Sequence, residues 1–160
     1  MKTFRVTVSG PVRAPAALVY GIIADYRRHH PNIVPPEYFT GLDVLEGGVG
    51  AGTRTRVAMQ VLGKKQVFEQ VVAEPEPGRV LRESNTDGSA VTFFTVEPSG
   101  ATASQVTIAT DVTQRGGIRG FLERLIVALV MPRIYRKEIE RLAAYAAGMR
   151  ESTAPAHVTR

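Results

Sequence analysis

The sequence predicts an α+β fold in which a seven-stranded, curved antiparallel sheet surrounds a long C-terminal helix. Apolar and polar residues alternate from Phe4 to Val8, as they do in a strand with one buried face. Six further segments of strand character follow, separated by turns rich in glycine and proline. After Gly116 and Gly117 the apolar period changes from two to about 3.6 residues, which is the period of a helix.

Two short helices are expected between the first strand and the remaining six. The first strand is expected to end at Gly10-Pro11. Pro15 can occupy the first turn of a helix, and apolar residues then recur at helical spacing as far as Tyr26. A second helix is expected over residues 28–34, because two prolines follow it and neither can continue a helix. The expected order of elements is therefore β-α-α-β6-α.

The six later strands share the alternation of a half-buried sheet. Their expected ranges are 38–46, 53–62, 66–74, 80–85, 91–97 and 105–113. The terminal helix is expected over residues 118–150, with one apolar stripe along its whole length and a bend at Pro132. One domain is expected over residues 1–151, followed by a flexible tail over residues 152–160.

Composition excludes several classes of function. The chain has no cysteine, so it offers neither disulfides nor thiolate ligands, and its three histidines lack metal-ligand spacing. We therefore expect no metal and no cofactor.

The alternating N-terminus does not resemble a signal peptide and no apolar run is long enough to span a membrane, so we expect a cytoplasmic protein. A net charge of +5 without a nucleic-acid-binding motif leaves room for peripheral membrane contact, while nucleic acid is not an expected partner.

Four segments of the sequence resemble a known superfamily. They are VRAPAALVYGIIADYRRHHPNIVP, LEGGVGAGTRTRV, EQVVAEPEPGRVL and RIYRKEIERLAAYA. With the order of elements, they are similar to the START-like (SRPBCC) superfamily and its helix-grip fold, and most similar to its polyketide cyclase/dehydrase and lipid-transport branch. The tryptophans that many relatives carry in the first helix are absent, and Tyr20 and Tyr26 stand in comparable places.

The resemblance implies a cavity between the sheet and the terminal helix that holds lipids, polyketides or aromatic molecules. Tyr135 lies on the apolar stripe of the helix, which directs its ring inward and lets its hydroxyl meet a neighbour or a ligand. The residues that we expect to line the cavity are Tyr26, His30, Met59, Phe68, Phe94, Leu125, Ala128, Leu129 and Tyr135.

An enzyme with this cavity would need an acid or a base facing the substrate. The candidates are His30, Glu69 and Tyr135. Glu69 enters the cavity if its strand turns the Val67-Glu69-Val71 face inward, but the opposite face is an equally good choice and the sequence leaves both open. The neighbouring strand carries Arg54 and Arg56, which we expect to point outward.

The expected function is a carrier or sequestering protein that binds a hydrophobic or amphipathic small molecule without chemistry. No catalytic triad, metal site or nucleotide motif supports an enzyme. Two alternatives stay open: a polyketide cyclase or dehydratase that uses acid and base residues in the cavity, and a cochaperone-like module whose basic exterior binds a protein partner. The oligomeric state is left open as well.

Overall fold

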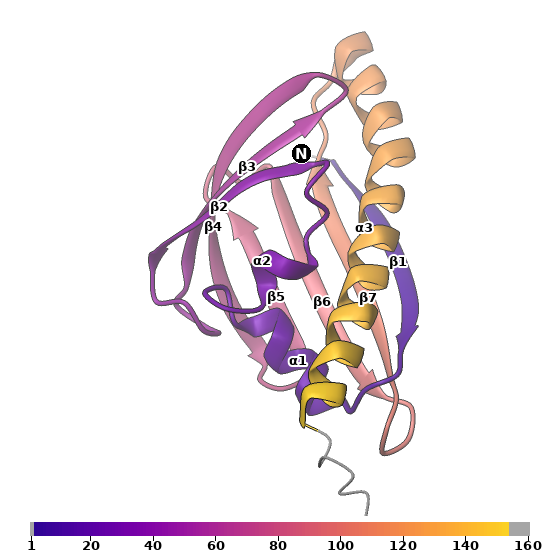
Figure 1. The fold of residues 1–160 in the computed structure, drawn as a ribbon. Coiled ribbons are helices and arrows are strands. Elements are labelled where there is room, and N and C mark those ends of the chain that lie inside the picture. Colours follow the sequence, from indigo (N-terminus) through magenta and orange to yellow (C-terminus); the bar gives the residue numbers. More distant parts are fainter. Residues whose placement is uncertain (1, 154–160) are drawn as a thin grey trace, which may run out of the picture.

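The computed structural model describes residues 2–153, which form one curved antiparallel sheet, two short helices and one long helix (Figure 1). The strands are Thr3–Val12 (β1), Phe39–Glu46 (β2), Arg54–Val61 (β3), Lys64–Glu76 (β4), Val80–Asn85 (β5), Ala90–Pro98 (β6) and Ser104–Thr113 (β7). The helices are Ala16–Ala24 (α1), His30–Ile33 (α2) and Gly117–Thr153 (α3). The predicted fold class and the predicted order of elements are confirmed.

The seven strands lie in the order β1-β7-β6-β5-β4-β3-β2, and every neighbouring pair is antiparallel. Strands β2 to β7 form a continuous meander, and β1 closes the order by pairing with β7. Strands β1 and β2 are thus the two edges, and α1 and α2 lie on the path that connects them. The sheet curls around these helices and around α3 (Figure 1).

Strand β1 is longer than predicted. It continues through Pro11, which pairs with Gln105 of β7, and it ends at Val12. Proline has no N–H to give to a sheet, but an edge strand has a neighbour on one side only, so Pro11 interrupts no ladder on the open side. The prediction that the strand ends at Gly10-Pro11 was therefore wrong by one residue.

Helix α2 is shorter than the predicted range of 28–34, because a turn precedes it. The side-chain oxygen Oδ1 of Asp25 accepts hydrogen bonds from the backbone N–H groups of Arg27 and Arg28, at 3.1 and 2.9 Å. An aspartate side chain that accepts from the backbone N–H two residues downstream closes an Asx turn. The N–H of Tyr26 donates to the carbonyl of Gly48 at 2.8 Å, which ties this turn to the β2–β3 connection.

Strands β3 and β4 are joined by a two-residue hairpin turn. Leu62 and Gly63 both have positive φ angles, of 51° and 76°, as the two central residues of a type I′ turn do. The tight turn lets β4 begin at Lys64, two residues before the predicted start of this strand.

Helix α3 runs without interruption through Pro132 and ends at Thr153. Ser152 and Thr153 thus belong to the helix and not to the predicted tail 152–160, and the rest of that tail lies outside the described residues. None of the helices in the described part of the chain combines the length and the apolar character that a membrane-spanning segment needs.

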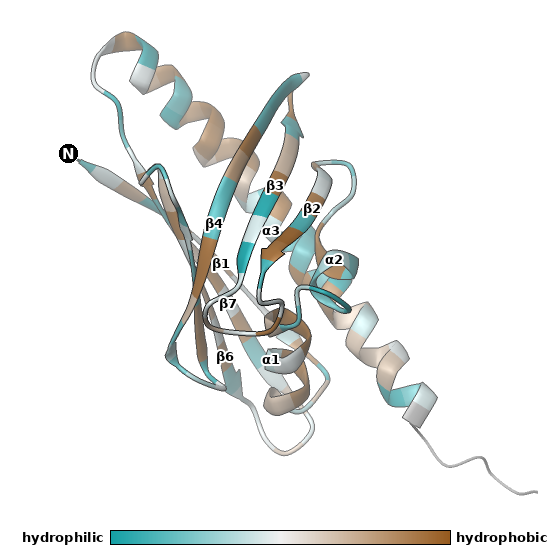
Figure 2. Ribbon diagram, turned by 90° about the vertical axis from the view of Figure 1, so that its left-hand side faces the viewer, coloured by the Kyte–Doolittle hydropathy of each residue, from teal (hydrophilic) through white to brown (hydrophobic). Residues whose placement is uncertain are grey.

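The two halves of α3 are buried to different extents. Side chains of the second half fill the space inside the sheet: Ile134, Tyr135, Glu138, Ile139, Leu142 and Ala146. In the first half, only the side that meets β1 and the end of β7 is covered. This half diverges from β3 and β4 (Figure 2). The prediction of one buried stripe along the whole helix is therefore confirmed for the second half and wrong for the first.

Candidate functional site

Five ionisable side chains are buried together between the sheet and α3, and we call them the interior polar cluster. Each is at most 8% exposed. Tyr26 and His30 come from the turn after α1 and from α2, Glu83 comes from β5, and Tyr135 and Glu138 come from α3. Because a buried ionisable group is costly unless it is hydrogen-bonded or neutral, the contacts of these five residues determine what the site can do.

The alternation of β5 and the helical period of α3 place the residues of the cluster on inward faces. On β5, Glu83 is two residues after the buried Leu81 and so shares its inward face. On α3, Tyr135 and Glu138 are three residues apart and therefore lie on the same side of the helix. The sheet curls around the helix, so these two faces meet (Figure 1).

A hydrogen bond within the cluster joins Tyr26 to Glu83. The hydroxyl of Tyr26 donates to Oε1 of Glu83 at 2.6 Å. Burial, followed by the charge and the hydrogen bond of Glu83, raises the pKa of Tyr26 well above its ordinary value. Tyr26 is thus a neutral phenol that holds one oxygen of the Glu83 carboxylate, while the amide of Gln70 lies 3.5 Å from the other oxygen.

The ring of His30 is fixed on three sides. Its Nδ1 lies 2.7 Å from the carbonyl oxygen of Ile23, and because a carbonyl only accepts, Nδ1 carries a proton. The ring stacks on Tyr26 with centroids 4.4 Å apart, and it meets the ring of Phe94 edge-on at 5.8 Å. These contacts direct Nε2 toward Oε1 of Glu83, at 3.8 Å.

Glu138 differs from the rest of the cluster because its carboxyl group forms no hydrogen bond with any residue in the range 2–153. Its side chain is nevertheless buried, with 3% of the residue exposed. Burial, and then repulsion from Glu83, raises the pKa of Glu138 well above the usual glutamate value. The group is thus favoured as a neutral carboxylic acid, which can both donate and accept a hydrogen bond.

Tyr135 ends a short chain of hydroxyl groups. Its phenol is hydrogen-bonded to the hydroxyl of Thr110, and Thr110 in turn bonds the hydroxyl of Thr92 at 2.8 Å. Burial raises the pKa of Tyr135 above its ordinary value. Tyr135 and Glu138 thus place a phenol and a carboxyl group with raised pKa values on one face of α3.

The structure brings together four of the nine predicted lining residues. Tyr26, His30 and Tyr135 belong to the interior polar cluster, and Phe94 packs on His30. Met59 and Phe68 are half-buried and share the inward faces of β3 and β4. These two side chains extend the site from the polar cluster toward the β3–β4 hairpin.

The other three predicted lining residues lie on the first half of α3 and are exposed. Leu125 is 48% and Leu129 is 55% exposed, and Ala128 is exposed as well. They do not form part of a closed wall, because this half of the helix diverges from β3 and β4 (Figure 2). That they contact a ligand stays a prediction.

Glu69 does not belong to the interior polar cluster. Its carboxylate is paired on the outer face of the sheet with the guanidinium of Arg56 at 2.9 Å and with that of Arg54 at 3.4 Å. The alternation of β4 explains the direction, since Gln70 and Val72 are the buried residues and Glu69 lies between two exposed valines. The inward option for Glu69 was therefore wrong, and the outward direction of both arginines is confirmed.

Neither glutamate of the cluster was among the residues predicted from the sequence. Glu83 could have been found from strict alternation with Leu81, and Glu138 from its position one helical turn after Tyr135. Both positions follow the apolar pattern but carry a polar residue. A polar residue at an inward position of a strand or helix is the signal that would have identified them.

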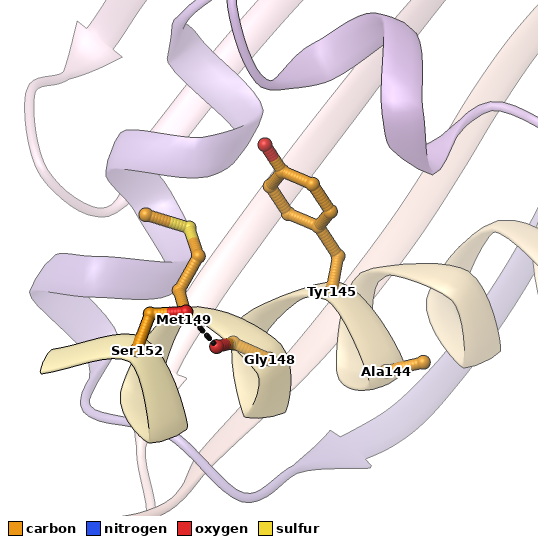
Figure 3. Close-up of a pocket in the computed structure, with 5 residues that line it drawn as sticks. All are labelled: Ala144, Tyr145, Gly148, Met149 and Ser152. Atoms are coloured by element: carbon orange, nitrogen blue, oxygen red, sulfur yellow. Dashed lines mark hydrogen bonds between the residues drawn. The ribbon is translucent and has the colours of Figure 1, made fainter. Parts of the chain in front are cut away.

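A separate hollow lies on the surface at the C-terminal end of α3 (Figure 3). It is open to solvent and is lined by Ala144, Tyr145, Gly148, Met149 and Ser152. The hydroxyl of Tyr145 lies 2.8 Å from Nδ1 of His29. No charged side chain lines the hollow, and Tyr26 and Glu138, whose pKa values are raised well above the ordinary ones, lie elsewhere, in the interior polar cluster.

Comparison of the structure with solved structures supports the fold assignment. The KanY protein is 30% identical, with a TM-score of 0.80 over 92% of this chain and 100% of that protein. An aromatase/cyclase from Streptomyces sp. R1128 is 20% identical, with a TM-score of 0.76 over 98% of this chain and 100% of that enzyme. A START superfamily protein from Mycobacterium smegmatis is 18% identical, with a TM-score of 0.64 over 94% of this chain and 99% of that protein.

Comparison of the sequence identifies the family. No curated protein matches the chain. A family model described as polyketide cyclase/dehydrase and lipid transport matches residues 3–147, which include all seven strands and the whole interior polar cluster. The chain therefore belongs to the polyketide cyclase/dehydrase and lipid transport family.

Proposed function

We propose that the protein binds an apolar small molecule that carries one hydrogen-bonding group, with that group at Glu138. The observation that supports this proposal is the carboxyl group of a residue that is only 3% exposed and has no hydrogen-bond partner among the described residues. Such a group has given up most of its contact with water without gaining a protein partner, at a cost of up to about 1–3 kcal/mol. A ligand carbonyl or hydroxyl that accepts the proton of Glu138 removes this cost, so the free protein is prepared for a ligand with such an end.

The surroundings of Glu138 favour an apolar body for the rest of the ligand. Phe94 lies beside the cluster, and Met59 and Phe68 continue the inward faces of β3 and β4 toward the hairpin that joins these strands. Neither Met nor Phe can form an ion pair with a charged group of a ligand, whereas both side chains bury apolar surface favourably. An aromatic or polyketide-like molecule with a carbonyl group has this combination of parts.

The test is a titration with Nile red, an apolar fluorophore that carries a carbonyl oxygen. We expect saturable binding to the unmodified protein and roughly tenfold weaker binding to Glu138→Leu, because one hydrogen bond to the ligand is lost. Glu138→Gln keeps a donor and should bind more tightly than Glu138→Leu. The matched control is Glu140→Gln, which changes an exposed glutamate on the same helix. Equal affinity of all four proteins would overturn the proposal.

A second candidate function is acid–base catalysis on the same ligand, as in a cyclase or dehydratase. It is favoured by the two buried carboxyl groups in different surroundings, because Glu83 accepts a hydrogen bond from Tyr26 while Glu138 accepts none. Such a pair can divide the roles of base and acid. Acetophenone in D₂O tests this candidate, since a catalytic base would exchange its methyl protons faster than buffer does. If the unmodified protein accelerates the exchange of the methyl protons, and both Glu83→Gln and Glu138→Gln lose this acceleration, the protein is an enzyme and not a carrier.

A further inference from the structure

The first half of α3 exposes a continuous apolar stripe. Its members follow one another at intervals of three and one, so they lie along one side of the helix, and each is between 44% and 83% exposed. They are Ile118, Phe121, Leu122, Leu125, Ile126 and Leu129. Scattered exposed apolar residues are ordinary in soluble proteins, but a contiguous group of this kind marks a surface that another molecule covers.

The charges around this stripe are almost all positive. Between residues 115 and 133 the helix region carries four arginines at positions 115, 119, 124 and 133, and one acidic residue, Glu123. Glu123 is half-buried on the side that faces Phe4 of β1. The stripe therefore has basic residues on its flanks and no exposed acidic residue between positions 115 and 133. Outside this range, the exposed Asp87 of the β5–β6 turn interacts electrostatically with Arg115.

The tip of the β3–β4 hairpin also combines exposed apolar residues with positively charged ones. At its tip, Leu62 is 77% exposed and Val67 is 66% exposed, with the exposed Lys64 and Lys65 between them. No acidic residue occurs from position 58 to position 68. The hairpin tip and the beginning of α3 lie at the same end of the molecule in both views (Figure 1 and Figure 2).

We propose that this end of the molecule docks on an anionic lipid bilayer. The apolar stripe of α3 lies in the interface between headgroups and acyl chains, Leu62 inserts beside it, and the flanking arginines and lysines meet anionic headgroups. An amphipathic helix with arginines beside an apolar face is the structure that lies in such an interface. The proposal concerns the surface alone and does not depend on what the interior polar cluster binds.

Charge argues against a second copy of the chain as the occupant. A two-fold contact through the stripe would place each set of arginines beside the same arginines of its partner, because the same surface is used on both sides. Like charges brought together in this way repel. An anionic bilayer offers the opposite charge both to the arginines of the helix and to the two lysines of the hairpin.

Co-sedimentation with vesicles tests the proposal. We expect the protein to sediment with vesicles that contain phosphatidylglycerol, to stay in solution with pure phosphatidylcholine vesicles, and to be released by salt. Arg119→Gln should weaken the partition roughly fivefold, since one basic residue near the surface is lost. Arg28→Gln is the matched control, because it removes the same charge from the turn before α2 and should have little effect.

A second readout reports insertion directly. The chain has no tryptophan, so Phe121→Trp introduces a single indole on the stripe, and its emission should shift to shorter wavelength with anionic vesicles. The pair Phe121→Ser and Leu125→Ser should abolish sedimentation, while Val49→Ser, in the exposed β2–β3 connection, should not. Failure of the unmodified protein to bind anionic vesicles would overturn the proposal. The proposal would also be overturned if the unmodified protein self-associated and Phe121→Ser removed this self-association. A second copy of the chain would then be the molecule that covers the stripe.

Discussion

Glu83 on β5 and Glu138 on α3 face each other inside the protein, and the charge of Glu83 raises the pKa of Glu138 beyond the effect of burial. A carboxyl group whose pKa is higher in the folded than in the unfolded protein binds more protons when folded. The contribution of Glu138 to the stability of the folded state is therefore largest at low pH. The folded state loses this contribution as the pH rises from the ordinary glutamate value of 4.5 through the folded pKa of Glu138.

The first prediction is that Glu138→Gln makes stability less dependent on pH. The amide is neutral at every pH, so the variant should gain in free energy of unfolding relative to the unmodified protein as the pH rises, by at most ~1.4 kcal/mol per pH unit. Urea unfolding at about pH 5 and about pH 8 measures this difference. Glu140→Gln should leave the pH dependence unchanged, because Glu140 is exposed. Parallel pH profiles for both variants would contradict the prediction.

The second prediction concerns the hydrogen bond between Tyr26 and Glu83. Tyr26→Phe removes the donor and leaves one oxygen of Glu83 buried without it, which should cost about 1–3 kcal/mol. Tyr38→Phe is the control, since Tyr38 is half-buried and its hydroxyl forms no hydrogen bond within residues 2–153. Thermal unfolding of both variants gives the comparison, and equal small losses would show that the oxygen of Glu83 is satisfied in another way.

The third prediction tests the close approach of β1 and α3. A Cβ added at Gly10 would lie 2.9 Å from Cγ2 of Ile139, which is closer than real Cβ contacts come. Gly10→Ala should therefore destabilise the protein by roughly 1–3 kcal/mol through overpacking. Ile139→Leu moves the branch away from the backbone, so the double variant should recover part of this loss. A double-mutant cycle measured by urea unfolding gives the coupling, and additive effects would argue against the contact.

Local periodicity is what made the fold predictable. The alternation of strands and the glycines and prolines of their turns are short-range signals, so β5 matches its expected range and the bounds of the other strands differ by a few residues at most. The deviations have local causes that periodicity does not contain. The Asp25 side chain shortens α2, and the edge position of β1 lets it continue through Pro11.

The site was less predictable because direction and coverage depend on distant parts of the chain. Both faces of the strand that carries Glu69 are equally apolar, and only the packing of Gln70 and Val72 in the folded sheet decides between them. The stripe of α3 is apolar along its length, but periodicity does not tell which part of a helix a sheet will cover. Leu125 therefore shares the pattern of the buried Leu142 and is exposed.

The last prediction concerns the turn between β3 and β4, where Leu62 adopts a positive φ of 51°. A left-handed conformation costs a residue other than glycine roughly 1–2 kcal/mol, whereas asparagine tolerates it and is favoured in type I′ turns. Leu62→Asn should therefore stabilise the protein by about 0.5–1 kcal/mol. The same change removes an apolar side chain from the surface proposed to meet the bilayer, so it should weaken partition onto anionic vesicles.

Val67→Asn separates these two effects. Val67 is also exposed near the hairpin tip, but it lies within β4, where valine is a better residue than asparagine. Its replacement should weaken vesicle binding and also lower stability. Urea unfolding and co-sedimentation of the two variants give the comparison. We expect Leu62→Asn, and not Val67→Asn, to combine higher stability with weaker vesicle binding. This result would mean that Leu62 contributes to membrane binding and not to the stability of the fold. Unchanged vesicle binding by Leu62→Asn would remove the hairpin from the docking surface.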